Sequence, residues 1–355
     1  MFTAYTPMPM TIFSRKQTTV GLDIGSGLVK AAVVEHGPGG PALTKVVVTP
    51  LPDDAIVEGE VMDPHLVVDA LKETLAAAGT KKPNVVIAVG GRDVIVKKIR
   101  TERVKVAQAR ELLRLEAQQH VPFDMDSVEL DFQLLDPLGD GLEMEVLLVA
   151  AKRDLVEAKM RLLEDAGVTP KLVDVDAFAL HNAFESNYPD AMSGVVALAN
   201  VGHEVTNVNV LVGGVPVLTR DLMIGTRRVR EDVQREVGLT AADAEMALRR
   251  GDTSPQLAAV ITRHAEDLAA GIERASAVLD GARGAGPLKA VYLCGGGARV
   301  AGLAPAVANR LRTRVELASP LVGLTVRDGA LDGIRADEMA PLLMLPFGLA
   351  LRKAA

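Results

Sequence analysis

The amino-acid sequence predicts an α/β protein, and two observations support this prediction. Short apolar runs typical of buried strands alternate with segments of helical periodicity along most of the 355 residues. The helices have readable ends, because Asp63 before Pro64 forms a predicted N-cap and Gly79 closes that helix. The clearest apolar runs are 85–89, 145–151, 195–199 and 290–294.

A polar, turn-rich stretch at 185–194 divides the chain into two halves that open alike. Residues 20–35 (VGLDIGSGLVKAAVVE) predict a strand, a glycine turn and a second strand, and residues 195–220 repeat this order. The two halves match in pattern rather than in identity. This indicates a weak internal duplication.

The amino-acid composition excludes several classes of function. A net charge of −7, dispersed basic residues and an aromatic content of 3% argue against a nucleic-acid partner. One cysteine, Cys294, cannot form an internal disulfide, and the six histidines show no zinc spacing, which indicates an intracellular protein. The apolar end of the chain, PLLMLPFGLALRKAA, is too short to span a bilayer and predicts either a buried helix or a membrane-surface anchor.

The glycine turn of the first half suggests a phosphate site. Backbone N–H groups of Gly25, Ser26 and Gly27 would form an anion-binding concavity, and Lys30 on the return strand would reach the same phosphates. Asp23, where the strand enters the turn, would hold Mg²⁺ through its water shell. The alternative is a plain hairpin with a solvated Asp and Lys, since the stretch matches neither a P-loop nor a dinucleotide fingerprint.

Two later stretches resemble parts of such a site. In LANVGHEV, Asn200 occupies the place of Asp23, and Gly202 the place of Gly25. Further on, a buried strand runs into three glycines that would let a flat ring or a phosphate approach the backbone. The alternative is a loop of small residues packed under a helix. The three glycines are Gly295, Gly296 and Gly297.

Three loops in this order resemble the nucleotide clamp of the actin-like ATPase superfamily. From about Thr19 onward the chain resembles, within that superfamily, the PilM family of type IV pilus assembly proteins, which is related to FtsA. The stretches QQHVPF (118–123) and VDVDAFAL (173–180) are the most specific, because actin-like proteins in general do not share them.

The resemblance implies a two-lobed actin-like ATPase fold with duplicated βαβ cores and an inserted subdomain of the FtsA/PilM type in the first lobe. Its expected parts follow along the chain in order. They are a flexible tail (1–18), a first lobe (19–192) with the inserted subdomain (about 94–165), a second lobe (193–334) with a small subdomain (about 227–280), and a C-terminal helix that returns to the first lobe (335–355).

The resemblance also implies that the lobes close on ATP and Mg²⁺. Asp23 would lie next to the metal, and Asp176 matches a position where some relatives keep a water-positioning acid. The implied phosphate-binding residues are Gly25, Ser26, Gly27, Lys30, Asn200, Gly202 and Gly225. The implied adenosine-binding residues are Glu245, Gly295, Gly296 and Gly297.

The chain departs from the family pattern at several of these places. Asn200 replaces the usual aspartate, which removes an acceptor for a magnesium-bound or attacking water. His203 and Glu204 stand where small hydroxyl-bearing residues are common, and Glu204 would add negative charge near phosphates. Thr226 replaces the second glycine after Gly225, and Leu248 stands in place of a basic residue. We therefore expect slow hydrolysis at most.

The implied role is that of a cytoplasmic scaffold. Members of the PilM family receive the N-terminal cytoplasmic segment of PilN in a groove between the first lobe and the inserted subdomain. Through it they connect the pilus motor proteins with the inner-membrane complex, so that membrane association comes from the partner. Self-association stays open. Two alternatives are an FtsA-like filament former with an exposed C-terminal anchor and a small-molecule kinase with Asp176 as base.

Overall fold

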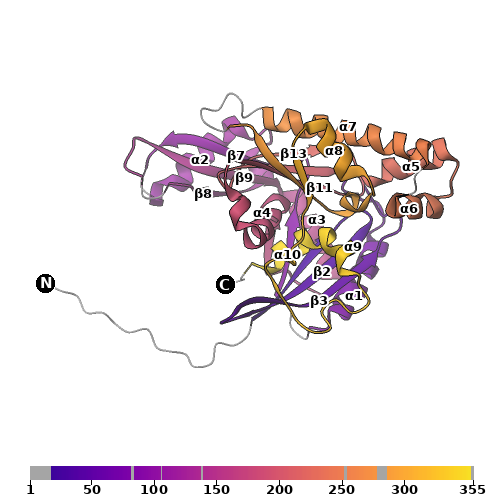
Figure 1. The fold of residues 1–355 in the computed structure, drawn as a ribbon. Coiled ribbons are helices and arrows are strands. Elements are labelled where there is room, and N and C mark those ends of the chain that lie inside the picture. The colour runs from indigo at the N-terminus through magenta and orange to yellow at the C-terminus, as the bar shows by residue number, and fades with distance from the viewer. Residues whose placement is uncertain are drawn as a thin grey trace.

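The computed structural model describes residues 17–80, 84–104, 106–136, 139–251, 254–277 and 286–352. Of the expected N-terminal tail, residues 1–16 lie outside the described part, while Gln17 and Thr18 already belong to strand β1. Two lobes lie one above the other in Figure 1, and a smaller α/β unit projects to one side.

The first lobe contains a six-stranded sheet in the order β10-β6-β1-β2-β3-β16. β1, β2 and β3 form an antiparallel meander, whereas β6 and β10 run parallel to β1. The strands are β1 (Gln17–Ile24), β2 (Leu28–Gly37), β3 (Gly40–Pro50), β6 (Asn84–Val89), β10 (Leu172–Val175) and β16 (Thr325–Val326). A two-stranded ribbon follows β3, formed by β4 (Ile56–Val57) and β5 (Glu60–Val61).

The second lobe repeats this arrangement. Its strands follow the order β15-β14-β11-β12-β13, again a meander with two parallel strands beside its first member. They are β11 (Val195–Val201), β12 (Thr206–Val212), β13 (Val215–Leu222), β14 (Leu288–Cys294) and β15 (Arg314–Leu317). The weak duplication in the sequence therefore corresponds to a repeated five-stranded frame.

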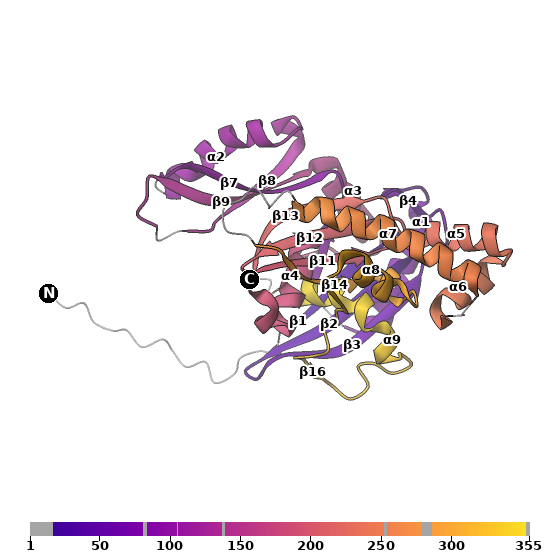
Figure 2. The ribbon, with the colours of Figure 1, turned by 45° about the horizontal axis from the view of Figure 1, so that its top comes forward.

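The projecting unit is the inserted subdomain. It contains β7 (Val94–Glu102), α2 (Val106–His120), a short 3-10 turn η1 (Met125–Ser127), β8 (Val128–Leu134) and β9 (Glu143–Lys152). β7 pairs with β13, so the subdomain extends the sheet of the second lobe, and β8 is its terminal strand (Figure 2).

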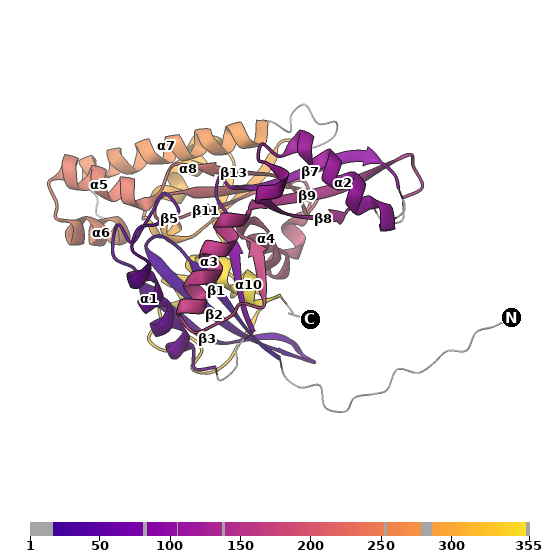
Figure 3. The ribbon, with the colours of Figure 1, turned by 180° about the vertical axis from the view of Figure 1, so that it is seen from behind.

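The subdomain ends earlier than the expected boundary near residue 165. Helix α3 (Arg153–Asp165) buries Leu162 and Leu163 in the core of the first lobe, together with Leu71. From behind, α3 lies beside α1 rather than on the subdomain (Figure 3). The structure therefore places the boundary at Lys152.

The helices cover the two sheets. The first, α1 (Pro64–Ala78), begins as predicted, since the Asp63 side chain accepts hydrogen bonds from the N–H groups of His65 and Leu66, and Gly79 ends it at φ 70°. The others are α4 (Asp176–Asn187), α5 (Thr226–Val237), α6 (Ala241–Arg250), α7 (Pro255–Ala277), α8 (Leu303–Leu311), α9 (Ala336–Met339) and α10 (Met344–Ala350).

The C-terminal segment packs inside the molecule. Phe347 and Leu349 are at most 1% exposed, and α10 lies so close to β1 that a Cβ on Gly21 would come within 1.9 Å of the Pro346 carbonyl oxygen. This contradicts the exposed membrane anchor that the FtsA-like alternative requires, because burial of the apolar side chains stabilises the fold instead. Among the described residues, no helix has the length and apolarity needed to cross a bilayer.

Candidate functional site

Three parallel strands of the first lobe end side by side, and a carboxylate or a glycine turn lies at the end of each. β1 ends with Asp23 and Ile24, β6 with the turn Gly90–Gly91, and β10 with Asp176, which begins α4. Ligands in open α/β sheets bind beyond the carboxyl ends of the strands, because loops and helix N-termini gather there. This end of the sheet is thus the candidate site.

Asp23 and Lys30 face each other across the first hairpin. They are register partners in β1 and β2, and their side chains form an ion pair in which each is only 12–13% exposed. The sequence predicted the two residues on opposite limbs of the glycine turn, and the structure brings them into contact. The pair leaves the Asp23 charge compensated by Lys30 in the protein itself.

The two hairpin loops have the same local geometry. The Gly25 N–H donates to the Leu28 carbonyl at 3.1 Å, and the Gly202 N–H donates to the Val205 carbonyl at 3.0 Å. Ser26 lies at the tip of the first loop, half-buried. The hydrogen bond of Gly25 uses its N–H inside the loop, so this group does not contribute to the predicted anion-binding concavity.

The second hairpin carries amides where the first carries charges. Asn200 pairs with Asn207 across β11 and β12, the positions equivalent to Asp23 and Lys30. The Asn207 side chain donates in turn to the Asp221 carboxylate on β13. Asn207 and Asp221 were not among the predicted site residues, because each lies in a strand with several polar residues and nothing in the sequence distinguishes it from them.

Two carboxyl groups lie against the Gly90–Gly91 turn. A Cβ on Gly90 would come within 2.1 Å of the Asp176 carboxylate, and one on Gly91 within 3.9 Å of the Asp221 carboxylate. Burial raises the pKa of Asp176 to about 6, with Lys159 opposing and Asp23 and Asp221 reinforcing the shift. Burial likewise raises the pKa of Asp221, against the hydrogen bond from Asn207.

Lys159 of α3 is a further residue that sequence reasoning missed. Its Nζ donates to the Ala88 carbonyl at 2.8 Å, just before the Gly90–Gly91 turn, and it favours the charged form of Asp176. An amphipathic helix pattern does not reveal which of its lysines points into a site.

The third glycine loop packs against the second hairpin. A Cβ on Gly295, whose φ is +81°, would lie 2.4 Å from the Asn200 amide oxygen, and one on Gly297 would lie 2.1 Å from Val201. Gly296 has room, since the nearest atom to its Cβ position is 3.8 Å away. Close packing therefore accounts for two of the three glycines. Buried Cys294 has its pKa raised to about 12 by burial, as expected of a packing residue.

Helix α6 lies beside this third loop. The Leu248 carbonyl accepts the N–H of Ala301, and Leu248 itself is 2% exposed in the core of the second lobe. A basic residue at that position would be buried, so it does not face a ligand. Glu245 pairs with Arg249 on the outer face of α6, and both act electrostatically on Arg299, which follows the third loop.

The unusual residues of the second loop contact the first lobe. Glu204 accepts the Glu58 N–H at 2.7 Å and pairs with Arg227, so its charge is compensated rather than added to a phosphate site. His203 approaches Gly27 closely, since a Cβ on Gly27 would lie 3.1 Å from the imidazole. Gly225 has no room for a side chain beside the His203 carbonyl, at 2.3 Å. We call the place where the loops 25–27, 202–205 and 295–297 meet the loop junction.

The donors at the loop junction are carboxylate and amide oxygens, which suit Mg²⁺. Among the described residues, no group of three or more His, Cys, Asp or Glu side chains gathers around one point that could hold a metal ion.

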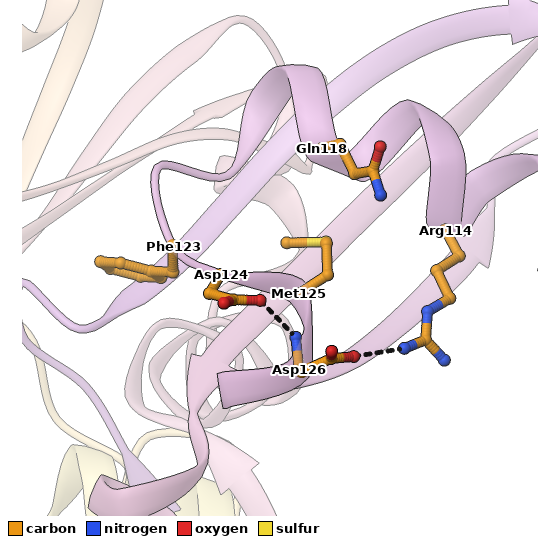
Figure 4. Close-up of a pocket in the computed structure, with 6 residues that line it drawn as sticks. All are labelled: Arg114, Gln118, Phe123, Asp124, Met125 and Asp126. Atoms are coloured by element: carbon orange, nitrogen blue, oxygen red, sulfur yellow. Dashed lines mark hydrogen bonds and ion pairs between the residues drawn. The ribbon is translucent and has the colours of Figure 1, made fainter.

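A hollow of about 460 Å³ lies on the inserted subdomain, continuous with a smaller one that shares three of its lining residues. Figure 4 shows the smaller hollow, with Arg114 and Gln118 coming from α2 and Met125 from η1, and with an Arg114–Asp126 ion pair at its rim. We call the two together the subdomain groove. It is lined by Arg114, Gln118, Phe123, Asp124, Met125, Asp126, Val128, Glu129, Leu130, Phe132 and Arg153.

Two lobes on a repeated five-stranded frame, with facing hairpin loops at their junction, define a protein of the actin-like ATPase fold. The sequence matches the family described as type IV pilus assembly protein PilM over residues 21–354. The chain therefore belongs to this family, as the sequence motifs predicted.

Solved structures agree with this fold. The PilM–PilN type IV pilus biogenesis complex contains a chain 27% identical, with 95% of this chain and 98% of that chain covered and a TM-score of 0.83. The ethanolamine utilization protein EutJ from Carboxydothermus hydrogenoformans is 17% identical, over 94% and 89% of the chains, with a TM-score of 0.56. MreB5 of Spiroplasma citri bound to ADP is 11% identical, over 94% of each chain, with a TM-score of 0.50.

Proposed function

We propose that this chain is a nucleotide-holding scaffold of the type IV pilus machine that binds the cytoplasmic N-terminal segment of PilN. The observation that supports this most strongly is membership of the family, together with the likeness to the PilM–PilN complex at a TM-score of 0.83. Through PilN the protein would connect the inner-membrane complex with cytoplasmic motor proteins, and its association with the membrane would come from that partner.

The subdomain groove is the candidate site for the PilN segment. Leu130 and Phe132 project from the same face of β8, and Met125 joins them from η1, which gives a row of apolar anchor points. Arg153, at the start of α3, lies where the first lobe meets the subdomain. A short peptide gains most of its affinity from apolar side chains seated in such a groove, while rim charges orient it.

A binding experiment with matched variants tests this site. Phe132→Ala removes an anchor inside the groove, whereas Leu142→Ala removes a side chain that is 91% exposed in the same subdomain and outside the groove. With a fluorescent PilN peptide, we expect Phe132→Ala to weaken binding about tenfold, which equals about 1.4 kcal/mol, and Leu142→Ala to leave it unchanged. Equal affinities of the two variants would place the peptide elsewhere.

The loop junction is the candidate site for ATP. Lys30 would meet the phosphates as a point charge, together with the loop residues Ser26, Gly27 and Gly225, and Asp23 would hold Mg²⁺ through water. Gly25 and Gly202 use their N–H groups within their own loops, so they would only let the phosphates approach the backbone closely. Gly296, which has open space beside it, and Glu245 on α6 would lie near the adenosine. MreB5, which shares the fold, has been solved with ADP.

Turnover would be slow. Asn200 cannot accept a proton from water as a carboxylate would, and its amide oxygen lies against Gly295. Asp176, which lies against the Gly90–Gly91 turn, would orient a water once nucleotide is bound. Bound nucleotide would then fix the conformation of the scaffold, and its hydrolysis would not drive the function.

Thermal shift with MgATP tests the loop junction. The wild-type protein should gain several degrees at saturating nucleotide, because a ligand that binds only the folded state stabilises it. Lys30→Ala should lose this gain, while Lys72→Ala, an exposed lysine on α1, should keep it. An undiminished gain in Lys30→Ala would overturn the phosphate assignment.

A further inference from the structure

One segment of the first lobe, residues 53–58, makes a set of polar contacts with the second lobe. Arg230 donates to the Asp53 carboxylate at 2.7 Å, and Arg227 donates to the Asp54 carboxylate at 2.8 Å. The Glu58 N–H donates to Glu204 at 2.7 Å. These contacts join parts of the chain that lie about 150–180 residues apart, so they exist only while the two lobes are together.

The second-lobe side of these contacts is a single rigid unit. The Arg227 N–H donates to the His203 carbonyl at 2.8 Å, and the Thr226 N–H donates to the Gly202 carbonyl at 3.0 Å, which fixes the start of α5 on the second hairpin loop. Glu204 pairs with Arg227 within the same lobe at 3.3 Å. The arginines therefore approach the first lobe from a preorganised position.

The first-lobe side is held in an unusual backbone conformation. Asp54 has φ 70° and Glu58 has φ 51°, the left-handed region that L side chains adopt rarely. In the described part of the chain the only other non-glycine residue with positive φ is Arg312. Such conformations persist where surrounding contacts fix them, and both strained residues make interlobe contacts themselves.

The residue Leu51, just before this segment, contacts the first glycine loop. The Leu51 N–H, two residues before Asp53, donates to the Gly27 carbonyl at 2.9 Å, and Gly27 in turn lies against His203. The spacing of the two hairpin loops therefore depends on the position of residues 53–58. If the interlobe contacts break, the two loops can move apart.

Each of these interlobe ion pairs is weak, and one of the arginines that form them has a buried nitrogen without a hydrogen bond. The Asp53 and Asp54 side chains are 51% and 70% exposed, so water and salt compete for each pair. The buried Nε atom of Arg230 has no hydrogen-bond partner. Burial, reinforced by Arg230, lowers the pKa of His203, so the neutral ring at 3.6 Å from Asp53 adds no ion pair at neutral pH. A set of this kind can open and close.

We propose that residues 53–58 form an ionic latch with Glu204, Arg227 and Arg230, and that this interlobe latch keeps the two hairpin loops of the junction in contact. In this latch Glu204 joins the two lobes, which explains why a glutamate stands where the family commonly has a small hydroxyl-bearing residue. The latch uses only residues of this chain, so it operates without nucleotide and does not depend on the proposed ATP site.

The test compares two conservative changes around Arg227. The pair Asp53→Asn and Asp54→Asn removes the two first-lobe carboxylates of the latch and keeps the backbone, because asparagine tolerates positive φ. The control, Glu231→Gln, removes another carboxylate partner of Arg227, at 3.1 Å, that lies on the same helix and joins no lobes. All variants are studied in the full chain without nucleotide.

Lobe separation is measured between spin labels at Glu73→Cys on α1 and Met246→Cys on α6, both exposed, while native Cys294 is buried. We expect one narrow distance distribution for the wild-type background and for Glu231→Gln. The Asp53/Asp54 variant should give a broader and longer one, with amide exchange at 25–27 and 203–205 at least tenfold faster.

Salt provides a second measurement that needs no variant. In 1 M NaCl the wild-type distribution should shift towards that of the Asp53/Asp54 variant, because screening weakens exposed ion pairs. If the variant and the Glu231→Gln control give the same distribution and exchange rates, or if salt shifts neither distance nor exchange, the latch is refuted.

Discussion

Asp176→Asn should make the ligand-free protein more stable at neutral pH. Burial raises the pKa of Asp176 from its ordinary value of 3.8 to about 6. A carboxyl group whose pKa is raised by folding binds its proton more tightly in the folded than in the unfolded state. Its ionisation therefore lowers the stability of the fold progressively from about pH 4 to about pH 6, and the loss persists at higher pH.

The size of the effect follows from the same values. The difference between 3.8 and about 6 corresponds to about 3 kcal/mol at 1.36 kcal/mol per tenfold change in proton affinity. Part of Asp176 remains exposed, and solvent screening reduces the gain to about 1–2 kcal/mol. For a chain of 355 residues that is a rise in Tm of about 1–3 °C.

Thermal unfolding followed by circular dichroism at pH 7.5 and pH 4.0 measures this gain. The variant should melt above the wild-type protein at pH 7.5, and the difference should disappear at pH 4.0, where the wild-type carboxyl is protonated. Asp190→Asn, at an exposed position, is the matched control and should change neither value. A lower Tm at pH 7.5, or an equal difference at both pH values, would refute the reasoning.

Three other changes have defined outcomes. Gly295→Ala should cost about 2–3 kcal/mol because its Cβ would overlap Asn200 at positive φ, whereas Gly296→Ala should unfold like wild type in urea; equal midpoints would contradict the packing. Arg352→Ala should cost about 2 kcal/mol by leaving the Asp174 carboxylate, 3% exposed, without its partner, and adding Asp174→Asn should recover most of the loss; no recovery would count against the pair. Asn200→Asp should raise ATP turnover in a phosphate-release assay, and an unchanged rate would contradict the role given to the missing carboxylate.

Short sequence patterns predicted those site residues that lie within a single hairpin. A short glycine turn joins its two strands, so Asp23 and Lys30 could be predicted on opposite limbs of it, while their ion pair appears only in the structure. The repeated hairpin could be predicted for the same reason, and its Asn200 was identified as the counterpart of Asp23.

Residues that distant elements bring together could not be predicted in this way. Asp221 comes from β13 of the second lobe and Lys159 from α3 of the first lobe, and only tertiary packing brings them near Asp176. The sequence of α3 does not tell which core the helix faces, which is why the subdomain boundary was predicted too late in the chain. Leu248 was interpreted as a departure at a position where a basic residue is common, and the sequence alone did not reveal that this position is buried.

The central claim, that the chain is a scaffold for PilN, is tested most directly by calorimetric titration of the full protein with a synthetic peptide of the cognate PilN N-terminal cytoplasmic segment. The account predicts saturable binding of one peptide per chain with a Kd in the micromolar range, about −8 kcal/mol. Absence of saturable binding up to about 1 mM peptide, weaker than about −4 kcal/mol, would contradict it.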